Sequence, residues 1–176
     1  MRNDPGVLMA TVIFRWFNLP ATGQVLLEHD LFVKWDEEKA IDILLQQWDN
    51  GENPVFGAGY IIKAGNGPKG CKIPNVCKSI TNVWKCQKDL VKTCRETNSM
   101  EVLWGELKEF PNLGPFNTYE IVCDVRSTAL LENAIDKMTW ANMGPGAKRG
   151  LNRVLGRPKE APLKNWEWKV QLQRLI

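Results

Sequence analysis

The sequence predicts an all-α fold of roughly eight helices. Apolar residues recur at intervals of three and four over several segments, which is the spacing of one helix face. Clusters of Asn, Gly and Pro, such as Asn50-Gly51 and Pro111 to Pro115, separate these segments. With 176 residues, 44% of them hydrophobic and 24% charged, the chain is expected to form a single domain, residues 1–176, with a substantial core.

Three helices are predicted in the first part of the chain. Residues 7–17 form an apolar helical run that ends at Asn18-Leu19-Pro20, and residues 23–33 carry a weaker helical pattern. Asp36 is placed to cap a third helix over residues 37–48, whose apolar residues share one face.

The remaining segments outside the centre continue this pattern. Residues 55–63 are apolar and contain two glycines, which predicts a helix packed closely against a neighbour. A glycine-rich loop is expected at 65–70, followed by one long helix over 74–94. Residues 147–155 are predicted to form a last helix, and the alternating apolar residues of 166–176 predict a strand or an extended tail.

Residues 100–126 carry the most distinctive pattern, a short helix, a tight turn and a second helix. A helical spacing covers residues 100–109, and the run from Pro111 to Gly114 interrupts it with residue types that tolerate left-handed backbone. The second helix is expected to begin near Pro115, because proline suits the first turn of a helix. Backbone N–H groups at such a turn and helix start can hold a phosphate.

This pattern resembles the helix-hairpin-helix of the DNA glycosylase superfamily, whose usual form is Leu-Pro-Gly-Val-Gly followed by a helix. Asn112 stands in place of the first glycine of that form. In those proteins an aspartate follows the hairpin at the start of a further helix, and here Asp136 lies twenty-two residues after Gly114. Phe116 occupies the position of the lysine in many bifunctional relatives, so a lysine-based lyase step is not expected.

A closer resemblance covers most of the chain. The matching stretches are, in order, Phe14–Asn18, Val55–Tyr60, Lys69–Lys72, Phe116–Arg126, Trp140–Asn142 and Gly144–Arg153. They resemble the helical domain of phage 5-hydroxymethyluracil DNA kinases and the phage proteins named α-glutamyl/putrescinyl-thymine pyrophosphorylases. Some of the latter act as amino acid:DNA transferases on phosphorylated hydroxymethyluracil. Such relatives carry an additional N-terminal helical segment, which we expect a partner chain to supply here.

Asp136 is the predicted catalytic residue, because of its spacing from the hairpin. It is expected at a helix start, where it would stabilise positive charge at a sugar C1′ or act as base or nucleophile. The alternative is an aspartate that only caps a helix.

A second predicted site is the glycine-rich run that begins at Gly144. Glycine lets a backbone approach a ligand closely, a helix follows at once, and the next basic residues would add charge-assisted contacts to a phosphate or diphosphate. The alternative is a plain loop. The run lacks the G-x-x-x-x-G-K-[ST] spacing of a kinase phosphate-binding loop. The full set of predicted DNA or phosphate contacts is Lys69, Lys72, Asn112, Gly114, Phe116, Asn117, Gly144, Gly146, Lys148, Arg149 and Arg153.

Two tryptophans and one charged pair complete the candidate residues. Trp16 and Trp140 are predicted to stack on an extruded base, or alternatively to belong to the core. Asp124 and Arg126 lie two residues apart and are predicted to form an internal salt bridge.

Charge and composition limit the kinds of partner that the chain is expected to bind. Net charge is only +3, and basic residues gather over 63–95 and 148–159, which predicts a modest DNA footprint or solvated helix faces. The first four of the five cysteines are six, nine and eight residues apart, a spacing that predicts reduced, mostly buried thiols and no metal site. No cofactor is expected. No run reaches the ~18 apolar residues of a membrane helix, so the expected location is the cytoplasm of a bacterial or phage-infected cell.

The predicted function is processing of a modified pyrimidine in DNA, with the target base flipped from the stack. An enzyme is expected. In one chemistry an amine displaces phosphate or pyrophosphate from an activated 5-hydroxymethyl group and gives a hypermodified thymine. A DNA glycosylase that excises the base is the first alternative, and a non-catalytic DNA-binding module that partners a DNA-base kinase is the second. Only the binding module should keep its function after Asp136→Asn.

Overall fold

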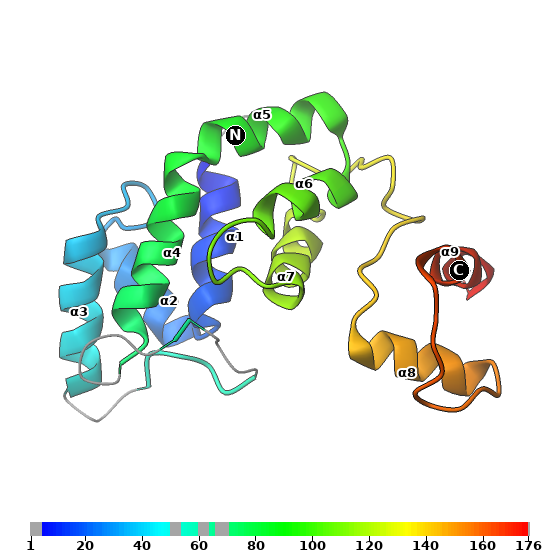
Figure 1. Ribbon diagram of the computed structural model, residues 1–176. Coiled ribbons are helices and arrows are strands. Elements are labelled where there is room, and N and C mark those ends of the chain that lie inside the picture. Colours follow the sequence, from blue (N-terminus) through cyan, green and yellow to red (C-terminus); the bar gives the residue numbers. More distant parts are fainter. Residues whose placement is uncertain (1–4, 50–53, 60–63, 66–70, 176) are drawn as a thin grey trace.

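The computed structural model describes residues 5–49, 54–59, 64–65 and 71–175, and within these ranges all regular secondary structure is helical. Helices α1–α7 form a body with α1 at its centre, and α8 and α9 lie to one side of this body (Figure 1). The helices are α1 Pro5–Phe17, α2 Pro20–Glu28, α3 Glu37–Asp49, α4 Ile73–Lys85, α5 Gln87–Thr97, α6 Met100–Leu107, α7 Pro115–Val125, α8 Pro145–Val154 and α9 Asn165–Leu175. The all-α prediction is confirmed for the described part of the chain.

Helix α1 is the centre of the body because its apolar residues point in several directions. It packs against α2, α4, α5 and α7, and a helix that is apolar around most of its surface is stable only when neighbours cover it on several sides. Six of its side chains are almost fully buried: Leu8, Met9, Val12, Ile13, Trp16 and Phe17. The helix predicted over residues 7–17 is therefore confirmed as the core of the fold.

The backbone at the end of α1 is in very close contact with residues 54–59. Asn18 ends the helix with left-handed backbone (φ 48°), and the Gly57 N–H donates to the Phe17 carbonyl at 2.8 Å. A Cβ at Gly57 would overlap the carbonyl oxygen of Asn18, so only glycine fits. The predicted close approach is confirmed, but the predicted helix is wrong for residues 55–59, which form a bend and a turn. Residues 60–63 and most of the predicted loop at 65–70 lie outside the described residues.

Three other segment predictions need correction. The long helix expected over 74–94 is two helices, because the chain bends at Cys86 and thereby lets both α4 and α5 pack on α1. The helix expected over 23–33 begins earlier, at Pro20, and gives way to turns after Glu28. The strand or tail expected at the end is helix α9, whose start is stabilised where the Glu167 carboxylate accepts the Lys164 N–H at 2.8 Å.

The helix predicted over residues 37–48 is confirmed as α3, and Asp36 caps it by accepting the Lys39 N–H at 3.0 Å. The last helix predicted, 147–155, is confirmed as α8 but starts at Pro145. Among the described helices, none has the length and apolar character required to cross a bilayer.

Candidate functional site

The turn between α6 and α7 forms as the sequence predicts. Asn112 takes left-handed backbone (φ 67°), and its side-chain amide donates to Ser79 Oγ at 2.9 Å, which ties the turn to α4. Gly114 then caps α7 in an extended conformation (φ −72°, ψ 166°), and Pro115 opens the helix. Of the two residue types expected to use left-handed backbone here, only the asparagine does so.

The start of α8 repeats the start of α7. Gly144 has nearly the same backbone angles as Gly114 (φ −75°, ψ 166°), and Pro145 again opens the helix. Neither start has a side-chain cap within the described part of the chain. An uncapped helix start is a general anion-binding element, because its first N–H groups lack partners within the helix and the helix dipole favours negative charge.

The carbonyl of Pro115 brings the two helix starts together. It accepts the indole N–H of Trp104 at 3.1 Å and the side-chain amide of Asn142 at 3.3 Å. The Asn142 carbonyl in turn accepts the Gly144 N–H at 3.0 Å. Hydrogen bonds to a single residue, Asn142, therefore link the first turn of α7 to the start of α8. We call the two starts and the basic residues of α8 the Gly-Pro surface.

Open space lies in front of both starts. A Cβ added to Gly114, Gly144 or Gly146 would meet no described atom within 4 Å. Glycine at these positions is thus not required by packing inside the protein, in contrast to Gly57, and the backbone can be approached closely from outside.

A shallow pocket of about 230 Å³ adjoins the start of α8. Arg149 lies in it, but its Nε donates to the Glu160 carboxylate at 3.0 Å. Buried Asn152 places Glu160 there, because its amide holds the carbonyl groups of Lys159 and Ala161 at 3.1 and 2.9 Å. The lining residues are Met143, Gly144, Pro145, Lys148, Arg149 and Glu160.

Two further basic residues of α8 belong to the Gly-Pro surface. Lys148 borders the pocket and forms no ion pair with a described residue, whereas Arg153 is exposed one turn later on the same helix. The structure thus groups most of the predicted phosphate contacts. Sequence analysis missed Glu160, which opposes one of them, because no local pattern links it to Arg149.

Asp136 lies away from the Gly-Pro surface, at the other end of α6. Its carboxylate accepts hydrogen bonds from Ser99 Oγ and from the N–H groups of Met100 and Glu101, at 2.7, 2.8 and 2.9 Å. With a rise of ~1.5 Å per residue, eight residues of α6 separate it from the turn by roughly 12 Å. The helix expected to start at Asp136 is instead a series of turns over 135–139.

The electrostatics of Asp136 follow from this cap. Burial favours the neutral acid, but the hydrogen bonds from Glu101, Met100 and Ser99 outweigh it and lower the pKa of Asp136 below its ordinary value. The residue is therefore a carboxylate at neutral pH and interacts with the dipole at the start of α6. The capping alternative describes what the structure shows, and a catalytic role for Asp136 stays a prediction.

The two tryptophans predicted to stack on a base are both buried. Trp16 has an exposed fraction of 1% and belongs to the core around α1. Trp140 has an exposed fraction of 8%, and its ring packs against Trp104 and Tyr119 at centroid distances of 5.8 and 5.7 Å. In these positions neither ring offers a free face to a base, which is the core alternative stated above.

Two of the remaining candidate contacts, Phe116 and Asn117, lie in the first turn of α7, beside the Gly114 start. Lys69 lies outside the described residues, and Lys72 is half-buried at the start of α4, with no described contact to the Gly-Pro surface. Asn117 is half-buried in the first turn of α7 and Phe116 is exposed beside it.

Asp124 pairs with Arg15 rather than with Arg126. The guanidinium of Arg15 donates Nη2 to Asp124 at 2.7 Å and Nη1 to Glu120 at 3.2 Å, and so locks α1 to α7. A single charged residue in the apolar run of α1 was the only signal for this clamp, and it did not indicate the partners.

The cysteines are free thiols, as expected. Cys71, Cys77 and Cys94 are buried, and burial raises the pKa of Cys94 to about 11, with the nearby Glu106 carboxylate adding to the effect. The Cys94 thiol is therefore neutral and unreactive at neutral pH. Within the described residues, no group of three or more His, Cys, Asp or Glu side chains is placed to hold a metal ion.

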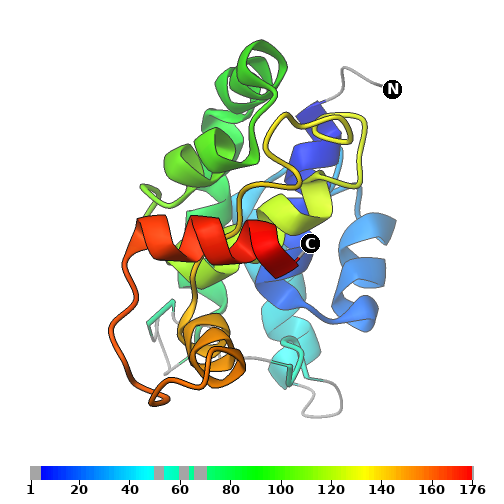
Figure 2. The same ribbon diagram turned by 90° about the vertical axis from the view of Figure 1, so that its right-hand side faces the viewer.

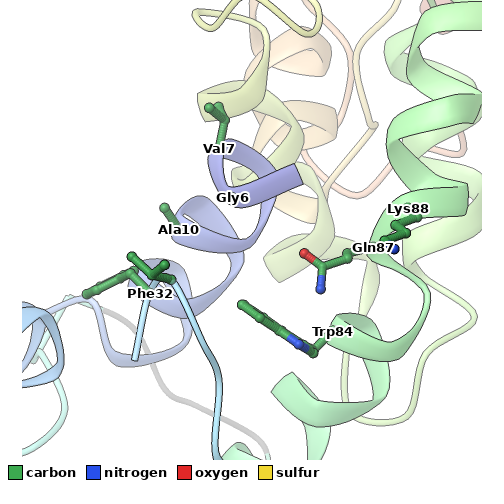
Figure 3. Close-up of a pocket in the computed structure, with 8 residues that line it drawn as sticks. Gly6, Val7, Ala10, Phe32, Trp84, Gln87 and Lys88 are labelled. Atoms are coloured by element: carbon green, nitrogen blue, oxygen red, sulfur yellow. The ribbon is translucent and has the colours of Figure 1, made fainter. Parts of the chain in front are cut away.

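A larger pocket, of about 440 Å³, lies elsewhere, at the start of α1 where α4 meets α5 (Figure 3). Its walls are mainly apolar, and Trp84 of α4 and Gln87 of α5 extend towards α1. No sequence motif pointed to it. The lining residues are Gly6, Val7, Ala10, Phe32, Val33, Trp84, Gln87 and Lys88.

Comparison with known proteins gives two matches. Residues 2–173 match the family described as 5-hmdU DNA kinase, helical domain. The chain is 29% identical over 162 residues to the 5-hmdU DNA kinase of Bacillus phage SP10, an alignment that covers 84% of this chain and 25% of the kinase. The chain thus spans about a quarter of the length of that relative. No solved structure matches it, so the helix-hairpin-helix glycosylase assignment stays a prediction.

Proposed function

The chain belongs to the family of 5-hmdU DNA kinase helical domains, and from this premise we propose that it binds DNA that carries a hydroxymethyluracil-derived base. Its role is to grip the DNA backbone next to the modified base, so that the base can be processed. The Gly-Pro surface is the observation that supports this proposal. Two uncapped helix starts, linked through Asn142 and Pro115, are suited to neighbouring phosphates of one strand.

The charge of the chain fits a small footprint. The net charge of +3 is too low for contact along a long duplex. Lys148 and Arg153 add two cations to the helix starts, while Arg149 is occupied by Glu160. We therefore expect the logarithm of the binding constant to fall with log salt at a slope of about −2 to −4, since each phosphate contact contributes about −0.9.

Displacement of phosphate by an amine is a second candidate function. The amine nitrogen would attack the 5-methylene carbon, and phosphate would leave with the electron pair of the carbon–oxygen bond. Asp136 would then accept the amine proton. A carboxylate with a lowered pKa is a weak base, and this one already accepts three hydrogen bonds in the α6 cap. Binding is therefore the better-supported function, and base excision is the remaining alternative.

A glycine pair tests the Gly-Pro surface. Gly144→Ala puts a methyl group into open space at a backbone conformation that alanine accepts, so the fold should persist while a phosphate is pushed away. We expect about a tenfold loss of affinity for a duplex with 5-hydroxymethyluracil, measured by fluorescence anisotropy. Gly150→Ala, within α8 and equally unobstructed, is the matched control and should bind normally. Equal affinity of both variants and the original chain would refute the proposed surface.

The ion pair of Arg149 with Glu160 offers a test in which DNA affinity should increase. Glu160→Gln removes the carboxylate that holds Arg149 and should tighten DNA binding a fewfold, because the guanidinium becomes available to phosphate. Lys148→Gln should weaken binding and reduce the salt slope by about one. If neither change alters affinity, the pocket beside α8 does not contact DNA.

Mass analysis separates binding from chemistry. Duplexes with thymine, 5-hydroxymethyluracil or its phosphorylated form are incubated with the chain, with and without glycine or putrescine, and weighed intact. Unchanged DNA with binding retained supports the binding module, a mass gain that matches an attached amine supports the transferase, and loss of the base supports the glycosylase. The proposed setting is the cytoplasm of a phage-infected bacterium, together with a DNA-base kinase.

A further inference from the structure

The pocket at the start of α1 has the size and lining of a small-molecule site (Figure 3). Its volume of about 440 Å³ falls within the range of pockets that bind small molecules. The lining is mainly apolar, and its polar side chains, Gln87 and Lys88, come from the first two positions of α5. Apolar walls with a few polar groups are the usual composition of a ligand pocket.

The apolar walls of this pocket favour a flat ring. Trp84 and Phe32 are partly buried and pack against the core, so each ring is held in place while part of its surface stays accessible. Trp84 extends towards α1 (Figure 3), where the lining residues Gly6 and Ala10 are small and leave room beside the indole. An accessible indole beside small residues is suited to stacking with another planar ring.

The polar groups of the pocket have no partner within the part of the chain that the structure describes. The indole N–H of Trp84 and the amide of Gln87 make no hydrogen bond to a described residue, and Lys88 forms no ion pair with one. The indoles of Trp35 and Trp168, by contrast, each donate a hydrogen bond within the protein at 2.9 Å. The polar groups around the pocket are therefore available to a ligand.

The lining matches the parts of a nucleotide. A side-chain amide both donates and accepts, so Gln87 can pair with the N–H and C=O groups on the edge of a nucleobase. Lys88 is the next residue of α5 and is exposed, and an ammonium group binds phosphate through charge-assisted hydrogen bonds. A purely apolar ligand would use neither group and would cover polar atoms without pairing them.

We propose that this pocket binds a nucleotide, with the base stacked on Trp84, the base edge paired with the Gln87 amide and the phosphate at Lys88. The inference stands on the pocket and is independent of the proposed Gly-Pro surface. The eleven residues of α5, with a rise of ~1.5 Å each, separate the pocket from the α6 cap at Asp136 by roughly 16 Å. The nucleotide is either free or part of an unpaired DNA strand, and the experiment distinguishes these two sources.

Nuclear magnetic resonance of the full, isotope-labelled chain tests the pocket directly. The indole N–H signal of Trp84 is assigned by its loss in Trp84→Phe and is followed during addition of thymidine monophosphate, deoxyribose phosphate or a short single strand of thymidylate. Thymidine monophosphate should shift the signal saturably, and deoxyribose phosphate, which lacks the base, should not. A shift with the single strand alone would support the pocket and identify DNA as the source. An equal shift with deoxyribose phosphate, or no shift with either nucleotide source, would overturn the proposal.

Variants of the lining localise the binding. Ala10→Leu fills the space beside Trp84 from a helix position that accepts leucine, and it should weaken nucleotide affinity more than about tenfold. Gln87→Leu should lose about tenfold through the missing hydrogen bonds, and Lys88→Gln a fewfold. Lys92→Gln, one turn further along α5 and outside the pocket lining, is the matched control and should bind normally. Unchanged affinity of both Ala10→Leu and Gln87→Leu would refute the pocket.

Discussion

The pair α8–α9 lies to one side of the body formed by α1–α7 (Figure 2), and the two regions are stabilised in different ways. The body buries a continuous apolar core around α1, reinforced by the Arg15 clamp to α7. Among its described side chains the pair buries Leu151, Asn152 and Leu163. It contacts the body through the Trp168 indole, which donates to the Ala141 carbonyl at 2.9 Å, and through an exposed ion pair of Lys169 with Glu101. Few apolar contacts mean a low free energy of local opening, so the pair should open before the body.

The Gly-Pro surface lies at the border between these two regions. The start of α7 belongs to the body, whereas the start of α8 belongs to the pair. One of the two proposed phosphate sites is therefore fixed by the core, and the other depends on a weaker attachment. Four substitutions test this difference, ordered from the largest expected effect to the smallest.

Gly57→Ala should have the largest effect, because it acts on the body. The added methyl group would overlap the carbonyl oxygen of Asn18 and force the 54–59 segment away from the end of α1. We expect a loss of roughly 3 kcal/mol or more in the free energy of unfolding, measured by urea denaturation with circular dichroism. Gly23→Ala, whose methyl would only touch the Phe14 ring at 3.5 Å, is the control. An unchanged midpoint for Gly57→Ala would contradict the close approach.

Asp136→Asn should cost about 1–2 kcal/mol at pH 7, because one amide oxygen cannot replace a carboxylate that caps α6 with three acceptor contacts. The pKa of Asp136 is lower in the folded state, so its contribution is complete above the unfolded value of ~3.9 and disappears as pH falls through the folded value. The stability difference from the original chain should therefore be constant from pH 7 to 5 and vanish in acid. A difference that grows in acid would exclude this cap, and Glu38→Gln serves as the exposed control.

Trp168→Phe tests the attachment of the pair. The substitution removes the indole N–H that donates to the Ala141 carbonyl and should cost about 1 kcal/mol. Hydrogen exchange should become faster in α8 and α9 and stay unchanged in α1, which shows that the loss is local. Equal acceleration throughout the chain would mean that the pair and the body unfold as one unit. Trp166→Phe, at an exposed position on the same helix, is the control.

Gly150→Ala should have the smallest effect, and of opposite sign. Position 150 lies within α8 with open space around it, so alanine should stabilise this helix by up to about 1 kcal/mol. Slower hydrogen exchange confined to α8 is the expected result. A slower exchange in the body as well would show stronger coupling between the two regions than their contacts indicate.

The sequence was sufficient to predict local structure where the backbone conformation depends on a single residue. The left-handed turn at Asn112, the helix starts at Pro115 and Pro145 and the cap at Asp36 follow from properties of single residues and their neighbours, and the sequence predicted most of them closely. Position 86 shows the limit of this reasoning, because one apolar pattern runs through both α4 and α5. The bend there depends on how both helices pack against α1.

The sequence by itself determined that the described part of the chain is helical and where most of its helices begin, and it singled out glycines and cations as candidate phosphate contacts. Only the tertiary structure decided that Asp136 caps α6, that Arg15 clamps Asp124 from 109 residues away, and that Asn142 joins the two helix starts. The physical reason is the distance along the chain over which each kind of interaction acts. Backbone preferences and caps act over a few residues, whereas a side-chain partner is chosen by which surfaces the buried core brings together.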